Sequence, residues 1–442
     1  MSGYKSIVFL LIVLVINVSK ASVDFEYEEK NEEDRLLNEW IDEIVKKSGV
    51  ETNFGFEGEL NVTALYIKQD QDTGYDQTVV SSQGDIAMRY RKKCDQFGFG
   101  GEIIAKADSG IIRAGDTVVR SSFLFWEGDK FGTLKLGYTD TAANSFSICG
   151  DKVLVGYTGA GSGNLPAFYN ASAGAIMGTG FTFDDGKAAK IVWLSPIIAG
   201  WSAGVSFTPD SRRRGLFKTT HNNGDGLSDK ADFANKSIAY SKNIITGGLT
   251  YAFGDPDQLN AEISASLWTG KGVAGKGVVA EVRDVLAYNV GAMICYKNLK
   301  ASLGYTYNGK SLQAKKQATD ELNEFDPNRN YALTDPRVGL LPGADAGEIY
   351  SVGLAYKWKR MNMSLGYFKS EVAFSKKQKA TADVVTMAVE YTFNRSLRMY
   401  CEYNYISTET CAQAQAYNSA CGLSTTGKNK ANAYMIGCKI NL

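Results

Sequence analysis

A single histidine limits the catalytic chemistry that is open to this chain. His221 lies in a polar stretch, TTHNNGDG, and any serine-histidine-aspartate triad would have to use it. The segment Gly270–Gly277 is close to a phosphate-binding loop, but a glycine stands where Ser or Thr would hold magnesium. The Asn and Asp side chains of residues 222–229 could bind calcium, yet no downstream glutamate completes a known loop. We therefore expect no enzyme, no cofactor and no metal site.

Charged residues alternate with apolar ones from residue 86 onwards, and this spacing assigns them to one face of extended strands. Ile86, Met88 and Tyr90 alternate with Arg89 and Arg91, so the two arginines share the opposite face. The same alternation adds further charged residues to that face in the next three segments, namely Glu102, Lys106, Arg120 and Lys135. A predominantly basic face that lines water would attract anions and orient water.

Acidic residues follow in a stretch that would connect two strands. Asp140 and Asp151 lie in its first part, and Asp184 and Asp185 lie near its end. If this stretch faces the basic strands, the two sets of charge create a transverse field that orders water and disfavours apolar solutes. The alternative is that several of these groups are ordinary solvated charges. The predicted constriction residues are Arg89, Arg91, Lys106, Arg120, Lys135, Asp140 and Asp151.

The elements that would position these charges are strands with a period of two. Leu299–Asn308, Glu348–Trp358 and Asp383–Phe393 each have an apolar face and a small or polar face. Segments of about ten residues with this pattern are typical of tilted transmembrane strands. Tyrosine and tryptophan gather at the strand ends, where they would meet lipid headgroups.

Short and long connections alternate along the chain, as in outer-membrane barrels. Short turns are expected at Lys297-Asn298, Lys359–Met361 and Asn394–Ser396. The longer, more polar connections are 140–187, 210–233, 270–283, 309–346 and 408–429. We predict an all-β fold: an antiparallel transmembrane β-barrel of about sixteen strands over residues 53–442, wide enough to hold water.

The first fifty residues differ from the rest. The apolar run Ile7–Val18 is too short to span a bilayer and precedes Ser19-Lys20-Ala21, so residues 1–21 are predicted to be a secretory signal peptide. Residues 22–52 contain an apolar stripe at helical spacing, which predicts a short amphipathic periplasmic helix at about 30–47. A partly ordered tail is the alternative for this segment.

Composition excludes some functions. The 48 basic and 48 acidic residues balance, so nothing favours nucleic acid as a partner. The seven cysteines match no metal-binding spacing. Cys411 and Cys421 lie ten residues apart in a polar stretch, where they could form a loop disulfide or remain two free thiols.

Two stretches resemble the trimeric Gram-negative porins of the alphaproteobacterial kind. Phe131–Ala142 (FGTLKLGYTDTA) is similar to the family's fifth strand running into the third loop, and Ile191–Asp210 is similar to its sixth and seventh strands. The alternating C-terminal strand also fits, although Leu442 stands where the family has a terminal aromatic residue. The resemblance implies a sixteen-stranded barrel, a homotrimer and an inward-folded third loop at about 140–187.

The function expected from this resemblance is a water-filled channel for passive diffusion of small hydrophilic solutes in the outer membrane. Its partners would be identical copies of the chain, outer-membrane lipid and lipopolysaccharide, and the barrel assembly machinery that reads the last strand. The alternatives are a substrate-specific channel on the same fold and a surface-displayed adhesin or structural barrel without channel activity.

Overall fold

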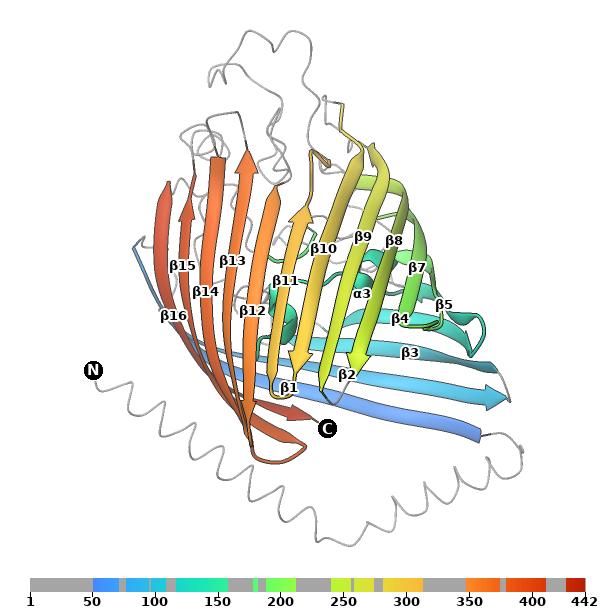
Figure 1. Cartoon of the computed structure of the whole chain (residues 1–442), viewed down its shortest axis with the longest axis horizontal. Helices are drawn as coiled ribbons and strands as arrows, with labels where there is room; N and C mark the ends of the chain where they lie inside the picture. The colour runs from blue at the N-terminus through green and yellow to red at the C-terminus, as the bar shows by residue number, and fades with distance from the viewer. Residues whose placement is uncertain are drawn as a thin grey trace, which may run out of the picture. The chain divides into compact units, whose positions relative to one another are not determined.

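Sixteen strands in the described residues pair in sequence order to form a closed barrel (Figure 1). The computed structural model describes residues 51–70, 77–94, 97–108, 117–157, 178–181, 188–211, 240–255, 258–273, 281–312, 347–373, 379–410 and 427–441. β1 pairs antiparallel with β16, from Glu59 opposite Asn441 to Gln69 opposite Ala431, and this pairing closes the sheet. The predicted sixteen-stranded antiparallel barrel is confirmed.

The strands have the following bounds. They are β1 (Glu51–Gln69), β2 (Thr78–Cys94), β3 (Phe97–Asp108), β4 (Thr117–Gly128), β5 (Gly132–Tyr138), β6 (Ala189–Leu194), β7 (Trp201–Asp210) and β8 (Tyr240–Asp255). The second half comprises β9 (Leu259–Val273), β10 (Val285–Tyr296), β11 (Leu299–Tyr307), β12 (Glu348–Trp358), β13 (Met361–Ala373), β14 (Lys379–Thr392), β15 (Leu397–Glu409) and β16 (Lys428–Asn441).

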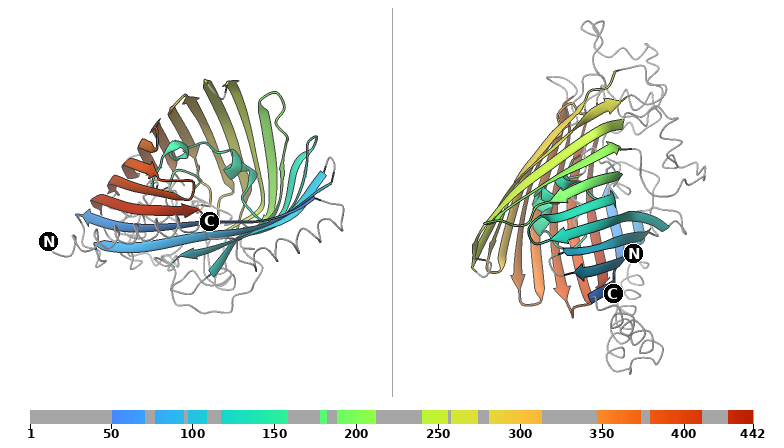
Figure 2. Two further views of the ribbon diagram at one scale, coloured as in Figure 1. Left: turned by 90° about the horizontal axis from the view of Figure 1, so that it is seen from below. Right: turned by 90° about the vertical axis from the view of Figure 1, so that its right-hand side faces the viewer.

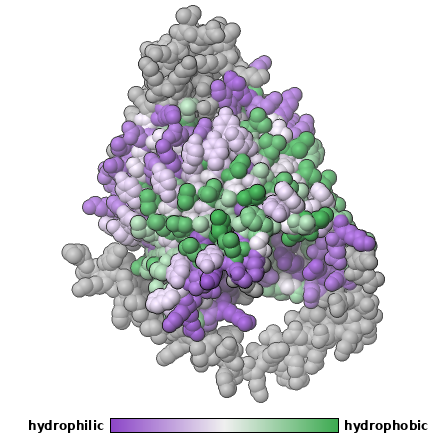
Figure 3. All heavy atoms as spheres, in the orientation of Figure 1, coloured by the Kyte–Doolittle hydropathy of each residue, from purple (hydrophilic) through white to green (hydrophobic). Residues whose placement is uncertain are grey.

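The period-two pattern places apolar side chains on the outside of the barrel. On β12, Val352 and Leu354 are exposed, whereas Ile349 and Ser351 on the other face are buried. Hydrophobic residues form a broad area across the middle of the outer surface in Figure 3, with hydrophilic residues above and below it. This apolar band is what a lipid-facing barrel surface requires.

Aromatic side chains gather at both ends of the outward face. Ring centroids lie 5.0 Å apart for Tyr305 and Tyr350 near the end with the long connections, and 4.5 Å apart for Trp201 and Tyr251 near the other end. The two bands include Tyr66, Tyr288, Tyr305, Tyr350, Tyr403 and Tyr434 at the long-loop end, and Trp201, Tyr251, Tyr296, Trp358, Tyr391 and Phe393 at the short-turn end. Rings at these two levels match the two headgroup regions of a bilayer.

Tight turns join strands at the short-turn end. Ala199 and Gly200 connect β6 to β7 with φ values of 51° and 85°, and Ile198 and Trp201 exchange backbone hydrogen bonds across them. Positive φ at both central residues is the geometry whose twist suits two strands of a hairpin. A Cβ at Gly200 would collide with the carbonyl oxygen of Ala252.

Strand limits agree closely with the sequence pattern, with one difference. The predicted Glu348–Trp358 is β12, and the predicted Leu299–Asn308 is β11 to within one residue. The predicted Asp383–Phe393 is longer in the structure, because the hydrogen-bonded ladder between β13 and β14 continues to Ala373 opposite Lys379.

The described helices are short and belong to the connection after β5. They are α3 (Ala142–Phe146) and the 3-10 turn η1 (Gly150–Val153). No helix among the described residues is long and apolar enough to cross a membrane. Several predicted features lie outside the described residues, namely the signal peptide 1–21, the helix at 30–47, His221, Cys411 and Cys421.

Candidate pore constriction

Residues Thr139–Tyr157, here called the inner segment, leave β5 and run along the inside of the barrel. Figure 2 (left) shows α3 and η1 within the ring of strands. The Thr141 hydroxyl caps α3 by accepting a hydrogen bond from the Asn144 backbone N–H at 3.2 Å. Ala142, Ala143 and Phe146 form the buried face of this helix. The short helix therefore begins where the strand pattern ends and turns an apolar face to the wall.

Backbone N–H groups of the inner segment donate to polar side chains that point inward from successive strands. Gly150 N–H donates to Ser351 Oγ on β12 at 2.8 Å, and Val155 N–H donates to Ser364 Oγ on β13 at 3.1 Å. The whole set of acceptors is Ser206 for Ala142, Thr246 for Ala143, Ser351 for Gly150, Ser364 for Val155 and Glu402 for Tyr157. Because buried backbone donors need partners, this series fixes the path of the segment around the wall.

Glycines on the inner face make room for that path. A Cβ at Gly248 of β8 would lie 2.5 Å from the Phe146 side chain, and one at Gly304 of β11 would lie 2.6 Å from the Ile148 carbonyl oxygen. The glycine track consists of Gly248, Gly291, Gly304, Gly353 and Gly366, on β8, β10, β11, β12 and β13. At Gly291, Gly304 and Gly353 the backbone of the inner segment packs directly against the backbone of the wall, whereas Gly248 and Gly366 make room for side chains of the segment.

Lysine ammonium groups hold both ends of the inner segment. Lys190 on β6, which is buried, donates to the Thr139 carbonyl oxygen at its start. Lys439 on β16 donates to the Gly156 carbonyl oxygen at 2.5 Å near its end. These charge-assisted bonds satisfy carbonyl groups that the irregular backbone leaves without a ladder partner.

A charged anchor surrounds the far end of the segment. Buried Glu402 accepts from the Tyr157 backbone N–H at 2.6 Å and from the Asn404 side chain at 2.8 Å. Lys439 also lies 3.9 Å from the carboxylate of buried Glu390, which in turn lies 3.8 Å from Arg398. Buried carboxylates need such partners, so these groups are mutually dependent.

The inner segment presents a different set of side chains to the interior. Asp140, Ser145 and Lys152 are exposed, and Asp151 is partly buried. Asp140 and Asp151, the predicted acidic residues, belong to this segment, and Lys152 follows Asp151 in the sequence. Asp184 and Asp185 lie outside the described residues.

The predicted basic residues of β2–β5 are partly neutralised by glutamates. Arg89 Nε donates to Glu102 Oε2 at 2.7 Å, and Arg91 forms an ion pair with Glu127. The arginine side chains nevertheless remain about half exposed, at 51% and 47%. Lys135 lies over the ring of Phe123, with Nζ 5.0 Å from its centroid. The side chains of Lys106 on β3 and Arg120 on β4 lie outside the described part of the structure.

Another part of the inner wall is apolar. At the long-loop end of β1 and β12–β16, a buried cluster packs with Tyr157 at its edge. The cluster comprises Leu65, Ile67, Ile349, Phe368, Ala382, Val384, Ile406, Ala431, Ala433 and Met435. The half-exposed arginines Arg89 and Arg91 lie nearer the short-turn end, on β2.

Sequence reasoning missed the anchor and the glycine track. Strand alternation does place Glu390 and Lys439 on the inward face, which marks them as lumen charges. It does not reveal that Lys439 meets the Gly156 carbonyl oxygen, because that contact joins residues 283 positions apart. Glycines at inward-facing positions of the strands could have indicated, from the sequence, that another segment packs closely against the wall there.

Comparison with known families and proteins gives a consistent result. The family model for Gram-negative porins matches residues 43–410, most of the chain. A protein of Rickettsia bellii is 25% identical over 66% of this chain and 71% of its own length, and one of Rickettsia felis is 23% identical over 82% and 88%. Both relatives are described only as uncharacterized proteins.

Solved structures share the fold at low sequence identity. The anion-selective porin from Comamonas acidovorans is 14% identical with a TM-score of 0.53, covering 89% of this chain and 100% of its own. The outer membrane channel DcaP of Acinetobacter baumannii is 12% identical with a TM-score of 0.52, covering 88% and 97%. The trimer form of OmpT of Vibrio cholerae is 14% identical with a TM-score of 0.52, covering 88% and 99%. With the closed barrel and the family match across most of its length, the chain belongs to the Gram-negative porin family and is an outer-membrane channel.

Proposed function

We propose that this channel lets small hydrophilic solutes and ions diffuse passively, and that its narrowest part lies between the inner segment and β2–β5. The inner segment contacts β6–β13, and its end is held by β15 and β16. Arg89, Arg91 and Lys135 lie on the remaining arc of the wall. Charges on both sides of an aqueous constriction would select solutes by size and polarity rather than by a fitted binding pocket.

The proposal rests on one observation: charged side chains are exposed both on the inner segment and on the strands that it does not contact. Asp140 and Lys152 are exposed on the inner segment, and both arginines remain half exposed despite their glutamate partners. Charge in water-filled surroundings can act on passing ions, whereas a dry ion pair cannot. The proposed constriction set remains Arg89, Arg91, Lys106, Arg120, Lys135, Asp140 and Asp151.

Single-channel recording in a planar bilayer tests the proposal. The folded protein, with a salt gradient across the membrane, is expected to give large ohmic steps and a reversal potential that reports ion selectivity. A folded barrel that gives no conductance would instead support a surface-displayed adhesin or structural barrel. Saturation of the current by one solute at low concentration would support a substrate-specific channel.

The basic residues of the wall can be tested by substitution. Replacing Arg89, Arg91 and Arg120 together with alanine is expected to shift the reversal potential towards cation selectivity, because the acidic partners would remain. Lys369→Ala, on the outward face of β13, is a matched control that should leave selectivity unchanged. An unaltered reversal potential in the triple variant would contradict the assignment of these residues.

We also propose that the channel is a homotrimer in contact with outer-membrane lipid and lipopolysaccharide. A trimer form is named for the OmpT structure whose fold this chain shares. The C-terminal strand, β16, would be read by the barrel assembly machinery before it pairs with β1.

A further inference from the structure

Tyr400 of β15 reaches across β16 to β1, at the joint that closes the barrel. Tyr400 is paired with Gly437 of β16, which in turn is paired with Thr63 of β1. The Tyr400 hydroxyl oxygen lies 2.5 Å from the Thr63 hydroxyl oxygen, and the hydroxyl donates to Asn61 Oδ1 at 3.0 Å. All three of these polar side chains are buried. The contacts therefore join the end of the chain to its first strand, across 337 and 339 positions.

Gly437 makes this reach possible. A Cβ at Gly437 would lie 2.5 Å from the ring carbon that bears the Tyr400 hydroxyl. The ring therefore occupies the space over β16 that a side chain would otherwise fill. A larger residue at position 437 would displace the ring and separate its hydroxyl from β1.

Other side chains brace the same three strands. On the inner face, Arg398 of β15 lies 3.7 Å from the carboxylate of Glu59 on β1. On the outer face, the Tyr434 ring of β16 lies 5.2 Å from that of Tyr403 on β15 and 6.3 Å from that of Tyr66 on β1. Both faces of the closing joint are thus held by contacts that extend from β15 to β1.

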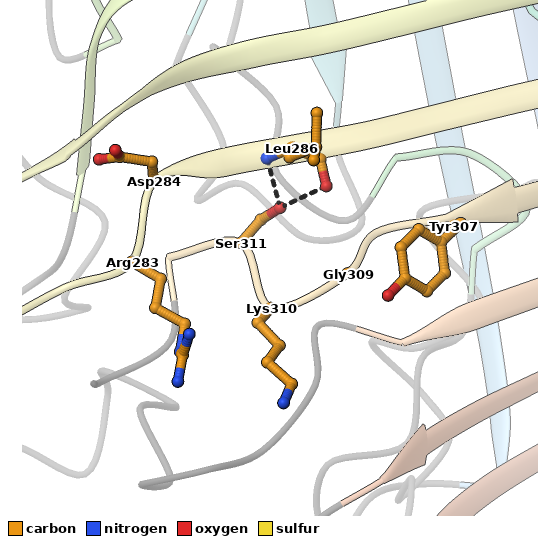
Figure 4. Close-up of a pocket in the computed structure, with 7 residues that line it drawn as sticks. All are labelled: Arg283, Asp284, Leu286, Tyr307, Gly309, Lys310 and Ser311. Atoms are coloured by element: carbon orange, nitrogen blue, oxygen red, sulfur yellow. Dashed lines mark hydrogen bonds between the residues drawn. The ribbon is translucent and has the colours of Figure 1, made fainter. Parts of the chain in front are cut away.

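A buried hydroxyl elsewhere in the wall provides a comparison. Ser311, in the turn after β11, bonds to the backbone N–H and carbonyl oxygen of Leu286 on β10 at 3.0 and 3.1 Å (Figure 4). The short turn between β10 and β11 already keeps these two elements together. Tyr400, in contrast, joins strands that no nearby connection holds, so its contacts depend on how β1 aligns with β16.

The register of β1 against β16 decides whether the Tyr400 contacts form. A shift of two residues keeps every side chain on its own face, so the alternating pattern by itself does not exclude such a shift. It would place Asn61 or Leu65 opposite Gly437 in place of Thr63. Tyr400 would then lose one or both of its partners, which favours the observed register.

Lys439 connects this joint to the inner segment. Its Nζ lies 5.5 Å from the centroid of the Tyr400 ring and donates to the Gly156 carbonyl oxygen. An ammonium group over an aromatic face is attracted by the ring. The Tyr400 ring therefore helps to hold the ammonium group where the inner segment ends.

We propose that Tyr400 selects the register in which β16 closes on β1 and, through Lys439, positions the end of the inner segment. Tyr400 is a positioning residue with two separable parts, because the hydroxyl contacts β1 and the ring faces Lys439. The second role rests on the proposed channel function, whereas the first is independent of it.

Disulfide formation during folding measures the register. Cys438 of β16 lies opposite Val62 of β1, so Val62→Cys reports the observed register in a protein whose other native cysteines are replaced by serine. Leu60→Cys and Ala64→Cys report a shift of two residues in either direction. Adding Tyr400→Phe is expected to raise the shifted cross-links about tenfold relative to the observed one, because the hydroxyl contacts are lost.

Two substitutions serve as controls for the loss of a hydroxyl group. Tyr403→Phe makes the same change on the outward face of β15, where the hydroxyl bonds only to Asn432 of the adjacent strand. Ser311→Ala removes the hydroxyl drawn in Figure 4. Both should leave the ratio of cross-links unchanged. An unchanged ratio with Tyr400→Phe, or an equal increase in either control, would overturn the assignment of register to Tyr400.

Single-channel recording separates the ring from the hydroxyl. Molecules locked in the observed register by the disulfide between residues 62 and 438 are compared. With Tyr400→Phe the open current should be as quiet as in the wild type, because the ring remains under Lys439, whereas Tyr400→Leu should give noisier currents. Equal noise in the two variants would overturn the positioning role. A wild-type protein without conductance would contradict the pore proposal and the positioning role together, and would leave the register result standing.

Discussion

At the scale of single residues, a few buried polar side chains hold the inner segment in place. Glu402 is only 3% exposed, yet it accepts hydrogen bonds from both Tyr157 and Asn404. Lys190 and Lys439 each donate to a backbone carbonyl at opposite ends of the inner segment. Each of these side chains forms a hydrogen bond with a backbone group of the segment that would otherwise need a water molecule as its partner.

Replacing Glu402 with alanine is expected to loosen the far end of the inner segment. The Tyr157 N–H and the Asn404 amide would lose their acceptor, at a cost of about 1–3 kcal/mol in the free energy of unfolding. Denaturant titration would measure that loss, and single-channel recording should show noisier open currents. Glu371→Ala at the outward rim is the control. Quiet currents and unchanged stability in the Glu402 variant would show that the contact does not hold the segment.

Cys149 is expected to be an unreactive thiol. Burial raises the pKa of Cys149 to about 12, and its neighbour Asp151 adds to the effect. Because the thiolate is the reactive form, maleimide at about pH 8 should label Cys149 only after unfolding. The folded state binds this proton more tightly than the unfolded chain, so stability should fall as pH rises from about 9 towards 12. Peptide mapping after labelling checks the first point, since rapid modification of folded protein would contradict it.

At the scale of elements, the barrel wall and the inner segment are shaped for each other. Glycines on five strands make room for the segment, three of them for its backbone and two for the side chains of Phe146 and Leu154. Ser206, Thr246 and Ser351 offer hydroxyl acceptors at matching positions on β7, β8 and β12. The backbone hydrogen bonds between strands need neither the glycines nor these hydroxyl groups. Both sets therefore act to position the inner segment.

Two adjacent glycines of β8 provide a matched test. Gly248→Val would force a side chain into Phe146, because a Cβ there lies 2.5 Å from that residue. We expect a loss of about 1–3 kcal/mol from overpacking, together with altered conductance. Gly247→Val is the control, since its Cβ would meet only the Gly204 carbonyl oxygen, at 3.6 Å. Thermal unfolding compares the two, and equal midpoints would argue against close packing of α3 on β8.

At the scale of the whole molecule, closure between β1 and β16 makes the barrel a single unit. The two aromatic bands and the apolar surface between them then fix its level in the bilayer. The interior is uneven, because half-exposed arginines lie on β2 and a buried apolar cluster lies at the long-loop end of β1 and β12–β16.

The oligomeric state can be read directly. Unheated protein in mild detergent is expected to migrate as a trimer, and heating is expected to convert it to a denatured monomer that migrates faster than the trimer. Channels in a bilayer should then close in groups of three. A single closing step together with a monomeric band would contradict the proposed homotrimer. Cross-linking at low protein concentration provides an independent measurement.

The sequence alone determined the strands, the class of fold and the faces of the wall. Alternation with a period of two is a local property, so it placed β12 at its observed bounds and put Arg89 and Arg91 on the interior face. It did not reveal their pairing with Glu102 and Glu127, because those contacts depend on the register between neighbouring strands.

Only the tertiary structure decided the course of the inner segment, its anchors and the contacts of Tyr400 across β16. Gly150 meets Ser351 across 201 positions, and Tyr157 meets Glu402 across 245. Such contacts depend on closure of the barrel, which brings β15 and β16 next to the beginning of the sheet and within reach of the segment that leaves β5. The local sequence pattern carries no information about which residues meet across the lumen. The sequence was therefore enough to predict the strands of the wall, whereas the course of the inner segment followed only from the tertiary structure.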